Sequence, residues 1–181
     1  MDLALRGLVD RAVERDPDAW EALYRRSYGP LFGFARRRLF DDQAAEDAVS
    51  ETMARALDGI DRFTWQGGGF DAWLFGIVRN VVRELSRARW RHAGPVADER
   101  PATDRSPEEH AVAGDDSAWM RAAFARLSDE DREILELRVQ GGLSSEEVGR
   151  ILGKRPGAIR MAQQRALQRL RVNLEEVSGV Q

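Results

Sequence analysis

Residues 143–171 read LSSEEVGRILGKRPGAIRMAQQRALQRLR, and this stretch contains two helix starts separated by a tight turn. Ser144, followed three residues later by Glu147, has the pattern of a capping box and predicts the first helix start. Gly153 supplies the left-handed residue that ends such a helix. Pro156 suits the first turn of the next helix. The stretch therefore predicts a short helix, a turn of three or four residues, and a second helix.

The two predicted helices, 145–152 and 157 to about 173, differ in how their faces are used. The apolar face of the second helix consists of Ile159, Ala162, Ala166 and Leu170. Its opposite face carries Arg160, Met161, Gln164, Arg165, Gln168 and Arg171. Arg and Gln bind guanine and adenine edges, and Arg also binds phosphate. The arrangement favours a helix-turn-helix that reads duplex DNA. The alternative is a solvated basic face on a packing helix.

The charge of the chain is strongly segregated, although the net charge is only −3 at pH 7. Residues 40–61 are acidic, 79–91 are basic, 92–118 are acidic and 144–172 are basic. Such blocks indicate separate surfaces for partners of opposite charge.

The acidic segment around residues 42–58 has the pattern of an amphipathic helix. Its predicted core face is made of Ala45, Val49, Thr52, Met53, Ala56 and Ile60. Glu46, Asp47, Ser50, Glu51 and Asp58 lie opposite. A solvated surface explains this pattern simply. The alternative is a docking face for a basic protein, because an acidic face repels DNA phosphates.

A long helix is predicted from Phe70 to about Trp90, after the glycine-rich loop WQGGGF. Its predicted apolar stripe is Phe70, Trp73, Leu74, Ile77, Val81 and Leu85. The far side carries Arg79, Asn80, Arg83, Ser86, Arg87 and Trp90. Cations interleaved with an amide and an aromatic ring suit single-stranded or melting DNA. Trp65, in the loop, either serves this role, folds back into the core or seals the loop.

The remaining pattern predicts an all-α fold with two small helical domains. Further helices are expected at 2–15, 17–27, 30–40, 117–127 and 128–140. Residues 93–116 are rich in proline and acids, and they predict a flexible acidic linker. The expected division is a domain at 1–92, the linker at 93–116 and a second domain at 117–175.

Composition excludes several classes of function. The chain has no Cys, which excludes disulfides and thiolate metal sites. His92 and His110 are its only histidines, so no metal site is expected. The carboxylates cluster on a solvent face without a histidine or a phosphate-binding loop, so we expect neither an enzyme nor a cofactor. No apolar run approaches the roughly 20 residues that span a bilayer. A cytoplasmic protein without membrane insertion is therefore expected.

Three segments in this order resemble an extracytoplasmic-function sigma factor of bacterial RNA polymerase. They are AAEDAVSETMARAL at 44–57, FDAWLFGIVRNVVREL at 70–85, and the segment from LSDEDREILELRVQ at 127–140 through the helix-turn-helix to residue 171. The similarity extends over nearly the whole chain. It implies a sigma region 2 domain followed by a sigma region 4 domain, with the linker directed toward the RNA-exit region of the polymerase.

The resemblance also implies roles for particular residues. Contacts to core RNA polymerase, through the beta-prime clamp coiled coil and the beta subunit, are implied for Asp42, Glu46, Asp47, Ser50, Glu51 and Arg55. Contacts to the minus-ten element of promoter DNA are implied for Trp65, Gln66, Phe70, Arg79, Asn80, Arg83 and Arg87. Contacts to the minus-thirty-five element are implied for Lys154, Arg155, Arg160, Met161, Gln164 and Arg165. An anti-sigma factor is a further partner that the family leads us to expect.

The implied mechanism is promoter selection and strand separation, with no bond chemistry by this chain. The alternative function is a helix-turn-helix regulator that does not bind core polymerase. That alternative leaves the acidic helix and the helix from Phe70 unexplained. The sequence departs from the family pattern at Arg160-Met161-Ala162, which keeps only the first cation of a common Lys-Ser-Arg run.

Overall fold

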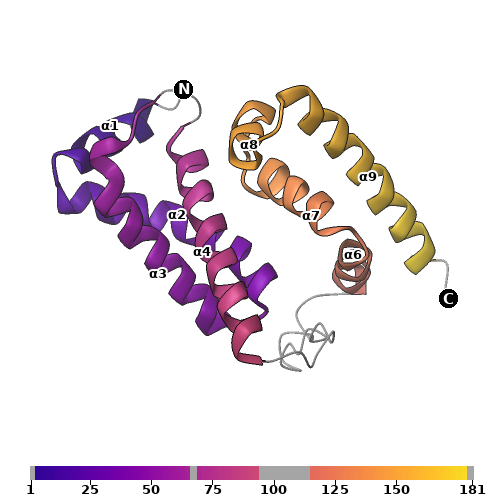
Figure 1. Ribbon diagram of the computed structural model, residues 1–181. Helices are drawn as coiled ribbons and strands as arrows, with labels where there is room; N and C mark the ends of the chain where they lie inside the picture. The colour runs from indigo at the N-terminus through magenta and orange to yellow at the C-terminus, as the bar shows by residue number, and fades with distance from the viewer. Residues whose placement is uncertain (1–2, 66–68, 94–114, 179–181) are drawn as a thin grey trace. The chain divides into compact units, whose positions relative to one another are not determined.

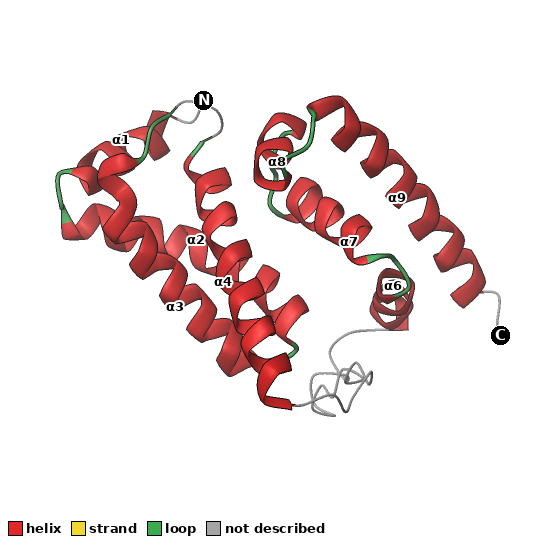
Figure 2. Ribbon diagram, in the orientation of Figure 1, coloured by secondary structure: helices red, strands yellow, loops and turns green. Residues whose placement is uncertain are grey.

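The computed structural model describes residues 3–65, 69–93 and 115–178, and within these residues the protein is helical without a strand (Figures 1 and 2). The helices fall into two compact units, one built from α1 to α4 and the other from α6 to α9. The all-α, two-domain prediction is therefore confirmed. Most of the predicted linker, 94–114, lies outside the described residues.

The first unit is a helical bundle. Its elements are α1 (Leu3–Val13), α2 (Pro17–Leu39), α3 (Asp42–Gly59), the short 3-10 helix η1 (Ile60–Arg62) and α4 (Phe70–Ala93). The starts of α2 and α3 are capped by Asp16 and Asp41, whose carboxylates accept hydrogen bonds from backbone N–H groups of the first turn. Helix α2 packs against α1, α3 and α4, and α3 also packs against α4.

The structure corrects the prediction of separate helices at 17–27 and 30–40. Helix α2 runs without interruption through Pro30, which lies exposed on its outer side. A proline inside a helix costs about 3 kcal/mol. Leu31 and Phe34 are buried on the core side just beyond it. Burying each of these side chains stabilises the helix by about 1.5–3 kcal/mol, which offsets the proline.

The core faces of α3 and α4 were predicted with different success. All the residues predicted for the core side of α3 are buried. In α4, by contrast, Trp73, Ile77 and Leu85 are only half-buried, whereas Val78 and Val82 are buried. Phe70, Leu74 and Val81 are buried as predicted, so half of the predicted stripe is correct. The buried face is broader than predicted because α4 packs against both α2 and α3.

The second unit is arranged around one long helix (Figure 1). Its elements are α6 (Asp115–Ala125), α7 (Asp129–Leu135), the π-helix η2 (Glu136–Gln140), α8 (Ser145–Leu152) and α9 (Pro156–Ser178). Helix α9 packs against α6, α7 and α8. One part of the core joins Leu127, Leu135 and Ala166, with Phe124 and Leu170 packed against them. The predicted helix at 128–140 is thus α-helical only to Leu135.

The turn between α8 and α9 closes tightly around Gly149. Gly153 adopts a φ of 68°, and the Lys154 N–H donates to the Gly149 carbonyl at 2.7 Å. A Cβ on Gly149 would lie 2.6 Å from the Lys154 carbonyl oxygen, which is a backbone atom and cannot simply rotate away. The close packing of α8 against the turn therefore requires glycine at this position.

Replacing Gly149 with alanine is expected to lower the free energy of unfolding of the second unit by about 1–3 kcal/mol, because the backbone must shift to remove the overlap. Urea unfolding followed by circular dichroism measures the change. Gly157→Ala is the matched control, since a Cβ there lies 4.0 Å from the nearest atom, the Nη2 of Arg160. Equal stability of the two variants would contradict this account of the turn.

None of the helices in the described part of the chain combines the length and the apolar character that crossing a membrane requires.

Candidate functional site

The polar residues of α3 form an exposed acidic face. We define the acidic face as Asp42, Glu46, Asp47, Ser50 and Glu51; every one of these residues is exposed. Internal contacts reach three of them: Arg36 of α2 donates to Asp42 at 2.6 Å, Gln43 donates to Asp47 at 3.2 Å, and Arg55 donates to Glu51 at 2.7 Å. The buried residues on the opposite side of α3 fix the helix to the bundle, so its acids point outward.

Arg55, predicted to lie among the polymerase contacts, joins α3 to α4. Its guanidinium donates to Glu51 at 2.7 Å and to both carboxylate oxygens of Glu84, at 3.1 and 2.8 Å. The hydrogen bonds to Glu84, and then those to Glu51, raise the pKa of Arg55 above its ordinary value. The hydrogen bond from Arg55 lowers the pKa of Glu84. The acidic face is therefore connected to α4 by a bridging cation, a partnership that sequence patterns within a single helix do not reveal.

This bridge leads to a prediction about pH. The pKa of Glu84 is lower in the folded protein than its ordinary 4.5, so the stability it contributes is present above pH 4.5 and is lost as the pH falls through the folded pKa. At pH 7, Glu84→Gln should lower the free energy of unfolding by less than about 1 kcal/mol, because the pair is exposed. The difference between wild type and variant should shrink at acid pH. Thermal unfolding from pH 7 to pH 3 measures it.

A matched variant is Glu14→Gln, which changes an exposed acid of the same unit. A wild-type advantage over Glu84→Gln that persists unchanged to pH 3 would contradict the assigned role of the ion pair.

The outward side of α4 is basic. We define the α4 basic face as Arg79, Asn80, Arg83 and Arg87; Asn80, Arg83 and Arg87 are exposed and Arg79 is half-buried. Arg89 instead folds back, donating to the Leu39 carbonyl at 3.0 Å and to Asp41 at 2.8 Å. The pKa of Asp41 is lowered, chiefly by the Ala44 N–H and then by Arg89. The Trp90 side chain lies outside the described residues.

The loop before α4 begins in a cluster of aromatic rings. Trp65 is half-buried; its ring centroid lies 5.1 Å from that of Phe63, and the Arg6 guanidinium lies 5.8 Å from the Trp65 centroid. Trp65 thus folds back against the bundle, one of the alternatives considered from the sequence. Gln66, also predicted as a DNA contact, lies outside the described residues.

Phe70 requires a correction. It was placed among the minus-ten contacts, but its side chain is fully buried against Phe63 and Trp73, with ring centroids 5.7 Å away in both cases. A large aromatic side chain at the first turn of α4 gains most by burial in this cluster. Phe70 therefore positions the start of the helix, and it exposes no ring to DNA in this structure.

The helix-turn-helix has the capping geometry expected from the sequence. The Glu147 N–H donates to the Ser144 Oγ at 3.2 Å, and the Ser144 N–H donates to the Glu147 carboxylate at 2.6 Å. The inner side of α9 is buried at Ile159, Ala162 and Ala166. We define the recognition face as Lys154, Arg155, Arg160, Met161, Gln164 and Arg165, all of which are exposed. This arrangement presents cations, an amide and a thioether together on the outer side of the turn and of the first half of α9.

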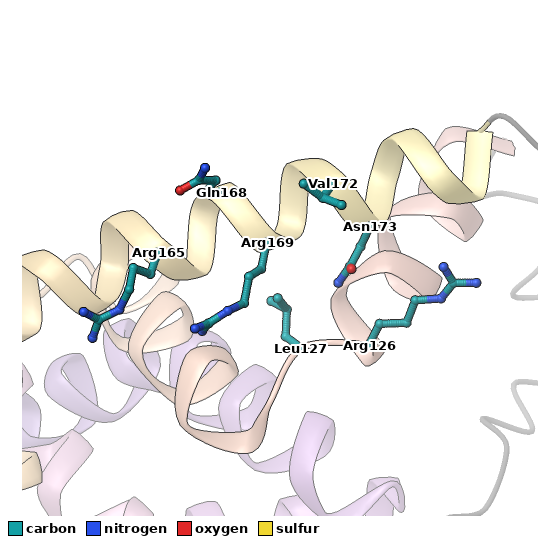
Figure 3. Close-up of a pocket in the computed structure, with 7 residues that line it drawn as sticks. All are labelled: Arg126, Leu127, Arg165, Gln168, Arg169, Val172 and Asn173. Carbon is teal, nitrogen blue, oxygen red and sulfur yellow. The ribbon is translucent and has the colours of Figure 1, made fainter.

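A cavity of about 390 Å³ lies along α9 and shares Arg165 with the recognition face (Figure 3). Its lining residues are Arg126, Leu127, Arg165, Gln168, Arg169, Val172 and Asn173. Arg169 donates to Asp131 at 2.5 Å, and Asn173 donates to the Ala123 carbonyl at 3.0 Å. These two contacts hold α9 against α7 and α6, so Arg169 and Asn173 serve the packing of the unit.

Comparisons with known proteins place both units in one family. Residues 23–92 match the family model for sigma-70 region 2, and residues 117–170 match the model for sigma-70 region 4. The ECF RNA polymerase sigma factor ShbA of Streptomyces griseus is 38% identical over 180 residues, covering 93% of this chain and 94% of that protein. BldN of Streptomyces coelicolor, also an ECF RNA polymerase sigma factor, is 36% identical over 90% of this chain and 63% of its own length.

Solved structures agree. The sigma factor RpoE, solved in complex with the anti-sigma factor NepR from Bartonella quintana, is 27% identical, with a TM-score of 0.67 over 88% of this chain and 96% of that one. CnrH, solved in complex with the cytosolic domain of CnrY, shares the fold at 24% identity, with a TM-score of 0.71 over 94% of this chain and 97% of that one.

Both sigma-70 regions are present in order, and relatives over nearly the full length are ECF sigma factors. A helix-turn-helix regulator without region 2 would match only the second unit, so that alternative is not favoured. The chain belongs to the extracytoplasmic-function sigma factors of the sigma-70 family, and its function is that of a sigma factor in transcription initiation.

Proposed function

We propose that this sigma factor performs promoter recognition through three distinct surfaces. The acidic face of α3 docks on the beta-prime clamp coiled coil of core RNA polymerase, and the beta subunit supplies further contacts. The α4 basic face and the loop carrying Trp65 and Gln66 engage the minus-ten element. The recognition face reads the minus-thirty-five element. The observation that carries the proposal is the sorting of charge among these faces, acidic on α3 and basic on the other two.

Charge decides which surface can meet DNA. The phosphate backbone attracts the arginines of α4 and α9 and repels the exposed acids of α3. The acidic face is therefore suited to a basic protein surface. Arg55 is exposed beside the acidic face and is held by Glu51 and Glu84, so a direct contact with polymerase would require it to exchange one of these partners.

The proposed division of the chain follows the same surfaces. Residues 1–92 act in polymerase and minus-ten binding, 117–175 act in minus-thirty-five binding, and 93–116 connect them. Neither part carries out bond chemistry; the core enzyme supplies catalysis, and no cofactor takes part. The protein acts in the cytoplasm, where it meets the polymerase. Since the solved relative RpoE is bound to the anti-sigma factor NepR, we also propose that an anti-sigma factor regulates this chain by covering its binding surfaces.

Reconstitution with bacterial core RNA polymerase tests the function as a whole. The full chain should co-elute with core enzyme in size-exclusion chromatography and should produce discrete run-off transcripts from genomic fragments that core enzyme alone does not transcribe specifically. Single-round transcription followed by sequencing of the RNA 5′ ends measures the result. Binding of the chain to DNA fragments without association with core enzyme would instead support a conventional regulator.

A further inference from the structure

The cations of the recognition face differ in their internal partners. Lys154 is paired with Glu130 of α7, and Arg160 donates to Glu146 of α8 with Nη1 and Oε1 at 3.2 Å. Arg155 and Arg165 make no ion pair with the residues that the structure describes. Two cations of a surface expected to bind phosphates are thus held by acids of the same unit.

Glu146 has only a modest role in the local fold, as an acid that favours the first turn of α8. It is the second residue of α8, whose N-terminus is already capped by Ser144 and Glu147. Its side chain is 56% exposed, and that of Arg160 is 60% exposed. Exposed ion pairs contribute little to stability. The contact of Glu146 with Arg160 therefore acts mainly on the arginine, which belongs to the proposed DNA-reading face.

The position of the Arg160 guanidinium indicates what Glu146 does. Nη1 contacts Glu146, while Nη2 lies 4.0 Å from the point where a Cβ on Gly157 would stand. The guanidinium therefore lies beside the first turn of α9, at the N-terminal end of the recognition helix. This is the part of such helices that reaches base edges in the major groove. An arginine held there loses less side-chain freedom on binding than a mobile one.

The geometry points to Glu146 as a specificity-determining residue for the duplex minus-thirty-five element, a role that rests on the proposed DNA-reading function of this face. Glu146 orients Arg160 toward a guanine edge, where the guanidinium bonds O6 and N7 in bidentate fashion. Its carboxylate also repels phosphates and competes for Arg160 when the base is wrong. Specificity is the difference between the affinity for the correct sequence and the affinity for a wrong one. Glu146 raises the first by orienting Arg160 and lowers the second by competing for it.

The experiment uses the full chain assembled with bacterial core RNA polymerase and a promoter library randomised through the minus-thirty-five element. Base preference is measured by sequencing the bound fraction for wild type, Glu146→Gln, Glu146→Ala and Arg160→Ala. Glu175→Gln is the matched control, because it removes a carboxylate that pairs with Arg171 on the same helix. Binding to an unrelated duplex is measured in parallel, and thermal unfolding checks each variant.

Wild type should prefer guanine at one position, and Arg160→Ala should remove that preference. Both Glu146 variants should reduce it by about twofold to fivefold, the range expected from the strength of an exposed ion pair. They should also bind the unrelated duplex more tightly, while Glu175→Gln keeps the wild-type base preference. Adding Glu146→Gln to Arg160→Ala should change the preference no further.

Two results would overturn the inference in different ways. If wild type selects a sequence through Arg160 and the Glu146 variants select it equally well, Glu146 has no role in specificity, although the proposed DNA-reading function stands. If wild type shows no preference anywhere in the randomised element, the proposed function of the recognition face fails, and the role of Glu146 fails with it.

Discussion

Reversing the charge of Asp47 and Glu51 to lysine is expected to weaken binding to core RNA polymerase by at least about tenfold, because like charges opposed across an interface cost more than 1 kcal/mol. Both acids are exposed on the acidic face. Fluorescence titration of labelled protein with core enzyme measures the affinity. The loss should diminish at high salt, since it is electrostatic.

Glu51 has an internal partner, and the design must allow for it. Lysine at position 51 repels Arg55, which also donates to Glu84 of α4. Part of the loss in core affinity would then come from a disturbed contact between α3 and α4. The single variant Asp47→Lys avoids this cation, because the neighbour that contacts Asp47 is the neutral Gln43. Charge reversal at Glu14 and Glu21 is the matched control, since both are exposed acids of the same unit and Glu21 likewise pairs with an arginine four residues on. Unchanged core affinity in a folded Asp47/Glu51 variant would exclude the acidic face as the docking surface.

Local patterns in the sequence predicted the parts of the fold in which one helix packs against the core with one face. The buried side of α3 and the capping box of α8 were found correctly, because each depends on spacing within a few residues. Helix α2 was divided wrongly at Pro30, since the penalty for proline is local whereas the burial of Leu31 and Phe34 is tertiary. The exposed face of α4 was found at Asn80, Arg83 and Arg87, and half of its predicted buried stripe was correct.

In the candidate sites, too, contacts between different helices could not be predicted from local patterns. The exposure of the acids on α3 follows from helical periodicity, but the bridge from Arg55 to Glu84 depends on how two helices pack. The pairing of Arg160 with Glu146 likewise joins neighbouring helices across a turn. The family resemblance implied a DNA contact for Phe70, whereas packing against Phe63 and Trp73 buries its ring. Helical periodicity predicted the exposed faces of the helices. The packing of neighbouring helices determined which side chains are buried or ion-paired.

The two basic surfaces are expected to fail at different steps when they are altered. Replacing Arg160 and Gln164 with alanine should weaken binding to duplex minus-thirty-five DNA by roughly 2–5 kcal/mol, if each side chain makes a specific base contact. Both lie exposed on the recognition face, one turn apart near the start of α9. Electrophoretic mobility shift with holoenzyme on a duplex promoter measures this loss.

Alanine at Asn80 and Arg83 should instead leave duplex minus-thirty-five binding intact and reduce formation of the open complex. These residues are exposed on α4, on the unit that does not contain the helix-turn-helix, and the proposed function assigns them to the minus-ten region. Permanganate reactivity of thymines in that region measures strand separation.

A promoter melted in advance separates two roles of Asn80. It should not rescue Asn80→Ala if the amide holds an unpaired base, and it should largely rescue the variant if the amide only assists melting. Loss of duplex binding in the Asn80/Arg83 variant, with normal melting once it is bound, would reverse the division of labour, because the charge on α4 would then be serving the duplex.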